Sequence, residues 1–221
     1  VRAQGTATAE GLQQTPQLGM LSQLARRATG STPYTLALAF RRGVPELQIS
    51  TTLQGLALAL PPPLGKPADS SLPLRFEAQV ARESLTGLTH GSSNGHGAPP
   101  LRDQITLDLG AVGTATYLRD VSGAQPRVLR GAIGVGLLAG ESAPQPTEGV
   151  GANIRLGKVD VDAWERLFTQ STGVAGAARP GPVPVMGPGP AANPAMDYLP
   201  NVLALRASEL TAEGRTLHNL V

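Results

Sequence analysis

The chain has 221 residues, and glycine (27) and proline (20) together make up about a fifth of them. Because both residues break helix interiors, this composition excludes a helical bundle. A hydrophobic content of 41% with a formal net charge of +2 likewise excludes disorder along the whole chain, which leaves an aliphatic, turn-rich, mainly β protein.

The charge distribution argues against nucleic acid as a partner. The basic residues are scattered along the chain, and the doublets Arg26-Arg27 and Arg41-Arg42 are too short to form a basic stripe. The absence of cysteine excludes disulfides and thiolate metal sites. No apolar run reaches the ~18 residues of a membrane span. Both ends of the sequence resemble interrupted strands, so we expect a segment of a longer protein.

The first predicted elements are a helix and two strands. Leucines at helical spacing predict a helix over residues 18–28. Leu47, Ile49 and Leu53 then share one face of an alternating stretch. The alternation changes phase at Gly55, which therefore marks a bulge or the start of a new strand.

Further alternating stretches follow, and each predicts a half-buried strand. Their apolar residues are Leu74, Phe76, Ala78 and Val80; Ile105, Leu107 and Leu109; Leu129, Ile133, Val135 and Leu137; and Ile154 and Leu156. The pattern predicts a mainly β fold: a curved antiparallel sheet of roughly eight to ten strands, shaped as a groove or a sandwich, with two short helices.

The second helix is expected near Asp162, which we interpret as its N-cap because Trp164, Leu167 and Phe168 follow at helical spacing. Two segments are too rich in glycine and proline for helices or central strands. Residues 84–100 are predicted to be a flexible loop, and residues 173–200 a proline- and glycine-rich linker.

Three motifs suggest chemistry, and none is supported by its surroundings. Residues 91–95 match G-x-S-x-G and lie between His90 and His96, but a glycine-rich loop cannot hold a nucleophile or a metal rigidly. Residues 134–139 match the dinucleotide fingerprint without the helix that it requires. Asp160 and Asp162 are interpreted as the start of a helix, with Asp162 as its cap, and not as a catalytic pair. We therefore predict no catalytic residue, no metal site and no cofactor, and the chain is not expected to be an enzyme.

One block of sequence resembles a known family. Residues 53–68, LQGLALALPPPLGKPA, followed by residues 72–75, are similar to a signature of the YhdP group of AsmA-like proteins. Residues 130–134, residues 149–164 (GVGANIRLGKVDVDAW) and residues 205–218 follow in the order of that family. The resemblance covers most of the chain except residues 84–100 and 173–200.

The resemblance implies a single β-rich segment, residues 1–221, from the middle of a much longer protein. Such proteins are anchored in the inner membrane of Gram-negative bacteria and project into the periplasm. They are linked to phospholipid transport between the two membranes and to outer-membrane permeability, by way of an apolar groove. The implied partners are phospholipid acyl chains and neighbouring segments of the same chain.

A two-faced aliphatic sheet suits acyl chains and an ordinary protein core equally well. The alternative function is therefore a non-catalytic β scaffold or protein-interaction module of the cell envelope. The candidate lipid-facing residues are the aliphatic residues of two strand faces: Leu47, Ile49, Leu53, Leu129, Ile133 and Val135. The oligomeric state is left open.

Overall fold

The computed structural model describes residues 1–14, 25–41, 44–81, 84, 100–123, 125–138, 141–172 and 196–220. The helical elements are α1 (Ala9–Gln13), α4 (Val161–Thr172) and the 3-10 helix η2 (Met196–Tyr198). The strands are β1 (Arg2–Thr8), β2 (Ala28–Arg41), β3 (Val44–Thr51), β4 (Leu56–Leu58), β5 (Leu74–Val80), β6 (Arg102–Asp108), β7 (Gly113–Asp120), β8 (Arg127–Val135), β9 (Gly149–Asp160), β10 (Val202–Ala212) and β11 (Arg215–Leu220).

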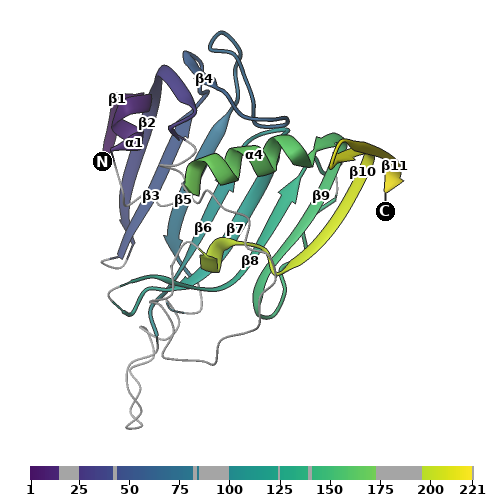
Figure 1. Ribbon diagram of the computed structural model, residues 1–221. Helices are drawn as coiled ribbons and strands as arrows, with labels where there is room; N and C mark the ends of the chain where they lie inside the picture. The colour runs from purple at the N-terminus through teal and green to yellow at the C-terminus, as the bar shows by residue number, and fades with distance from the viewer. Residues whose placement is uncertain are drawn as a thin grey trace.

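The strands form one open, curved sheet (Figure 1). Its order is β1-β2-β3-β5-β6-β7-β8-β9-β10-β11, and β4 pairs with β2 beside this path. The predicted mainly β fold with a curved, predominantly antiparallel sheet and two short helices is confirmed. The sheet is nevertheless mixed, because β9 runs parallel to both β8 and β10. Strand alternation reports which face a side chain occupies, but not the direction of the strand.

The two parallel connections cross opposite faces of the sheet. The connection after β8 passes over the face of Thr114 and Gly134, where Leu137 lies against Gly134. The connection after β9 contains α4 and η2, which lie on the other face (Figure 1). On that face the Tyr117 hydroxyl donates to the carbonyl oxygen of Tyr198. Both connections move in the same direction along the sheet, so they have opposite handedness. One of them therefore departs from the right-handed rule for such crossovers.

A small apolar core lies at the β1 end of the sheet, beneath α1 and β4. Ala9, Ala28, Leu53 and Leu56 are buried there. The predicted helix over residues 18–28 is wrong at its end, since Arg26 and Arg27 form a turn and Ala28 already belongs to β2; residues 15–24 lie outside the described residues. The phase change at Gly55 does mark a new strand, because β4 begins directly after it.

The start of α4 corrects the predicted cap. The Asp160 carboxylate, not that of Asp162, accepts the backbone N–H of Ala163 at 2.8 Å, which is the geometry of a helix cap. Asp162 accepts the N–H groups of Glu213 (2.7 Å) and Gly214 (3.0 Å) in the β10–β11 turn. These bonds, led by Gly214, hold the pKa of Asp162 below its usual value. The side chain thus fastens α4 to the last hairpin.

Trp164 attaches α4 to the loop before β5. Its indole Nε1 donates to the carbonyl oxygen of Pro62 at 3.2 Å, and its side chain is half-buried. Replacing Trp164 by alanine is therefore expected to lower the free energy of unfolding by about 2 kcal/mol, less than the ~3 or more of a fully buried ring. Trp164→Phe, which keeps most of the ring, should recover about half of that loss in urea titrations. An unfolding midpoint unchanged by Trp164→Ala would contradict this attachment.

The structure describes only the ends of the two predicted loops, residues 84–100 and 173–200. Residues 85–99 and 173–195 lie outside the described residues. Ser84 is buried, and its hydroxyl donates to Pro100 and accepts from the N–H of Arg102. At the end of the predicted linker, η2 packs against the sheet. Hydrogen bonds to neighbouring backbone therefore order residues that composition alone assigned to loops.

Candidate functional site

One face of the sheet carries a continuous row of apolar side chains. Each residue of this row is the cross-strand partner of the next, from β1 through β10. The row, called here the apolar row, consists of Ala3, Leu36, Ile49, Phe76, Leu107, Ala115, Ile133, Ala152 and Leu203. With strands ~4.8 Å apart, nine strands extend it over about 38 Å. It runs across the strands of the sheet and not along any one of them.

The neighbouring row on the opposite face is mainly polar. It consists of Gln4, Thr35, Ser50, Arg75, Asp108, Thr114, Gly134, Asn153 and Ala204, which are again successive cross-strand partners. Adjacent residues of each strand therefore place apolar side chains on one face of the sheet and mainly polar side chains on the other. The sheet is amphipathic across nine strands, as the alternating sequence predicts.

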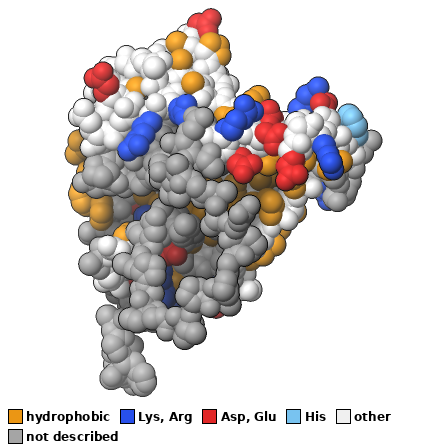
Figure 2. Space-filling view, viewed as in Figure 1, with side chains coloured by type: hydrophobic (Ala, Val, Ile, Leu, Met, Phe, Trp, Pro, Cys, Tyr) orange, Lys and Arg blue, Asp and Glu red, His pale blue; other side chains and the backbone are white. Residues whose placement is uncertain are grey.

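The large side chains of the apolar row are only partly buried. Ile49, Phe76, Leu107 and Ile133 are all intermediate in exposure, although Ala152 beside them is buried. At the β10 end, Leu203 is 57% exposed. Figure 2 shows hydrophobic side chains on this side of the molecule below α4. An apolar surface of this extent that stays partly exposed is typical of a binding surface.

The structure brings four of the six predicted site residues onto this face. Ile49 and Ile133 belong to the apolar row, while Leu47 and Val135 occupy the adjacent rows. Leu53 does not belong there: its φ of 51° ends the alternation, and its side chain is buried in the core beneath α1. Leu129 lies at a register shift between β7 and β8, so strand alternation does not place it on the face.

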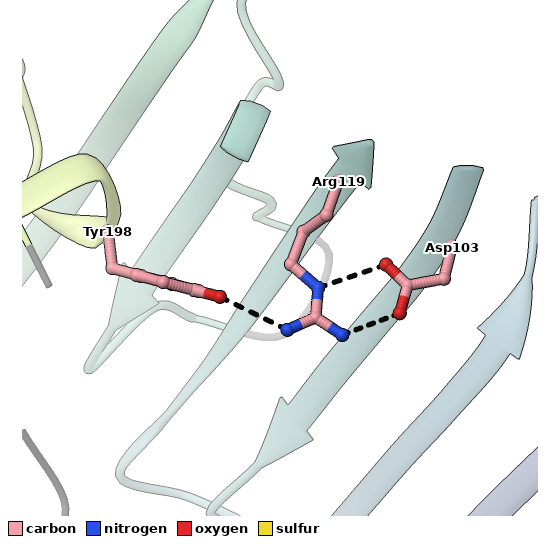
Figure 3. A network of polar contacts seen from close by, with 3 residues as sticks. All are labelled: Asp103, Arg119 and Tyr198. Atoms are coloured by element: carbon pink, nitrogen blue, oxygen red, sulfur yellow. Dashed lines mark hydrogen bonds and ion pairs between the residues drawn. The ribbon is translucent and has the colours of Figure 1, made fainter. Parts of the chain in front are cut away.

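A polar network that the sequence analysis missed lies on the same face (Figure 3). Asp103 and Arg119 are cross-strand partners on β6 and β7, and the Arg119 guanidinium donates two hydrogen bonds to the Asp103 carboxylate. Arg119 Nη1 also donates to the Tyr198 hydroxyl at 3.1 Å. The bond with Asp103 is the main cause that raises the pKa of Arg119. The sequence did contain a signal for this network, because Asp103 is a charged residue on the same strand face as Ile105 and Leu107.

This network fixes η2 against the sheet. The Tyr117 hydroxyl donates to the carbonyl oxygen of Tyr198 at 3.1 Å, and the two rings meet edge to face with centroids 5.2 Å apart. Both Asp103 and Arg119 keep 18% of their side-chain surface exposed. The polar cluster therefore anchors the end of the β9–β10 connection at one end of strands β6 and β7.

Burial, and secondarily the charge of Tyr198, raises the pKa of Tyr117 to about 12 from its ordinary value of 10.0. The folded state therefore favours the neutral phenol. This contribution to stability is complete below the unfolded pKa and is lost as the pH rises through the folded pKa, between about 10 and 12. Phenolate absorbance should show a late transition that Tyr117→Phe removes. A titration curve that Tyr117→Phe leaves unchanged above pH 10 would refute this environment.

The signature-like block of residues 53–68 has a structural role. Lys66 Nζ donates to the carbonyl oxygens of Leu53, Leu56 and Pro67, and the backbone of Lys66 pairs with Leu58. Lys66 thereby satisfies three backbone carbonyl groups and holds the block in a compact loop, next to the core beneath α1. This block therefore shapes the end of the sheet and presents no reactive group.

Chemistry-bearing residues are sparse in the described part of the chain. It holds no group of three His, Asp or Glu side chains that could bind a metal ion. His90, His96 and residues 91–95 lie outside the described residues, and His218 is exposed on β11. Gly136, in the dinucleotide-like motif, lies against the Arg155 carbonyl rather than at a helix start. None of the described helices is long and apolar enough to cross a membrane.

Comparisons with known proteins found no similar family, protein or structure. No family model matches the chain, no curated protein matches it, and no solved structure matches its fold.

Proposed function

We propose that this chain is a segment of a bridge-like envelope protein that carries phospholipid acyl chains between the inner and outer membranes. The observation that supports the proposal best is the apolar row, which continues across nine strands without a polar side chain. The resemblance of residues 53–68 to YhdP-type AsmA-like proteins points in the same direction.

The apolar row meets the physical requirements of a path for lipid transport. Each CH₂ group of an acyl chain gains about 0.8 kcal/mol on leaving water, so a transport path must offer apolar contact along its whole length. The row extends about 38 Å, whereas the hydrocarbon of one bilayer leaflet is only about 15 Å thick. A whole acyl chain therefore fits along it. A lipid tail needs no polar partner, and the row offers none.

The proposal places the chain in the periplasm, as a non-catalytic part of a protein anchored in the inner membrane. Neighbouring segments of that protein would continue the path at either end. In the alternative function, a β scaffold or protein-interaction module, the apolar row would be covered by protein and not by lipid. Both functions need the same fold, so the occupant of the row distinguishes them.

Native mass spectrometry of the purified chain tests the proposal. The chain is expressed in a Gram-negative host, released in a mild detergent and transferred to the gas phase with and without added phospholipid. We expect masses that correspond to one or more bound phospholipids and that disappear after delipidation. If the chain carries only detergent under all these conditions while it keeps its folded charge states, the lipid function is wrong and the scaffold is favoured.

A further inference from the structure

An open pocket of about 630 Å³ lies beside η2, where β6, β8 and β9 begin. Its volume is within the usual range for small-molecule sites. Three arginines line it, Arg102 from β6 and Arg127 and Arg130 from β8. Carboxylates of Glu148 and Asp197 line it as well. The pocket thus combines charges of both signs in a chain that is otherwise poor in charge.

The strand register explains why the arginines converge. Arg102 and Arg127 are the cross-strand partners of the same residue, Asp120 on β7, from its two sides. The pKa of Asp120 is lowered, first by its hydrogen bonds with Ser122 and further by the charges of Arg127 and Arg102. Arg130 follows on β8, opposite Leu118 and Gly149. Paired strands, rather than a mobile loop, therefore hold the three arginines at the pocket.

Arginine matches a phosphate group in geometry as well as in charge. Its planar guanidinium presents several N–H donors in a fork that fits two phosphate oxygens. The exposed carboxylates of Glu148 and Asp197 would accept hydrogen bonds from an ammonium group nearby. Leu118 and Leu199 add apolar walls. Such a lining fits an amphiphile whose head carries both a phosphate and an amine.

The pocket lies where β6, β8 and β9 begin, beside η2, and there it adjoins the apolar face. Strand alternation assigns Arg102 and Arg130 themselves to the opposite face, because they adjoin Asp103 and Gly131, which belong to the apolar face. Asp197 and Leu199, which line the pocket, flank Tyr198, whose hydroxyl accepts a hydrogen bond from Arg119 on that face. Val128, another lining residue, is the cross-strand partner of Arg119. We propose that this arginine pocket binds the phosphate-bearing head of the phospholipid whose acyl chains lie on the apolar face. This inference rests on the proposed function.

Binding of soluble probes tests the pocket. The probes are a phospholipid with two short acyl chains and an ethanolamine head, the same head without acyl chains, and inorganic phosphate. Calorimetric titrations compare the natural chain with Arg127→Gln and Arg130→Gln, and with Arg215→Gln, which removes an exposed arginine from β11. We expect each pocket variant to weaken binding of the short-chain phospholipid by about tenfold, and Arg215→Gln by less than about twofold. Circular dichroism confirms that the variants fold.

The outcomes separate the pocket from the acyl-chain surface. Equal losses with Arg127→Gln and Arg215→Gln would show unspecific charge attraction and overturn the site. Inorganic phosphate that binds as tightly as the phospholipid would make it a phosphate site and overturn the lipid head as its ligand. Phospholipid binding that is lost in Ile49→Asp but unchanged in both pocket variants would overturn the inference and leave the proposed function standing.

Discussion

Replacing Gly30 by alanine is expected to lower the free energy of unfolding by about 4 kcal/mol. Gly30 has a φ of 95°, and a Cβ atom there would overlap the carbonyl oxygen of Gly55. Ser31 donates its N–H to that same carbonyl, so the two backbone segments cannot move apart without loss of the bond. Left-handed strain and overpacking each cost about 1–3 kcal/mol, and both apply here. Urea denaturation followed by circular dichroism measures the change.

Gly157 provides the matched control for Gly30. It lies in β9, and a Cβ atom there would meet nothing within 4 Å. Gly157→Ala should therefore leave stability unchanged or raise it by about 0.5 kcal/mol, because glycine weakens a strand interior. If Gly30→Ala were as stable as Gly157→Ala, the close approach of β2 to the turn before β4 would be wrong.

Introducing a charge into the apolar row should impair transport. Ile49→Asp or Ile133→Asp would remove contact with about three CH₂ groups of a bound acyl chain, at ~0.8 kcal/mol each, and lower lipid occupancy by roughly fiftyfold. In the intact protein we expect either variant to leave the outer membrane as permeable as in cells that lack the protein. Sensitivity of such cells to detergents, with protein level measured in parallel, reports the effect.

Ser50→Asp and Gln48→Asp are the controls for that experiment, because both residues alternate with Ile49 on the opposite face of β3. They add the same charge to the same strand and should retain function. Loss of function in all variants alike, with normal protein levels, would mean that charge on this strand, and not the apolar row, matters.

Alternation predicted the strand faces correctly wherever the strands were regular. Ile49 and Ile133 were assigned to an apolar face from their own strands alone, and the register joins them in one row. Leu53 was misplaced because its positive φ changes the phase, and the register shift at Leu129 leaves that residue without a face assigned by alternation. Neither Leu53 nor Leu129 is a residue type that signals a break in strand alternation, whereas Gly55 is one.

The pairing of segments that lie far apart in the chain could not be predicted from the sequence. β9 pairs in parallel with both β8 and β10, and strand alternation gives no sign of strand direction. The Asp103–Arg119 pair could have been noticed, because opposite charges in phase with apolar neighbours need a partner. Its contact with Tyr198, nearly eighty residues later in the chain, could not.

Photocrosslinking in cells measures the occupant of the apolar row most directly. A photoreactive amino acid is placed in the intact protein at Leu36, Ile49, Leu107 or Ile133, and at the adjacent polar-face residues Thr35, Ser50 and Asp108. The account predicts phospholipid adducts at the four apolar positions and none at the three polar ones. Active protein that forms no lipid adduct at any apolar position, or equal adducts on both faces, would contradict it.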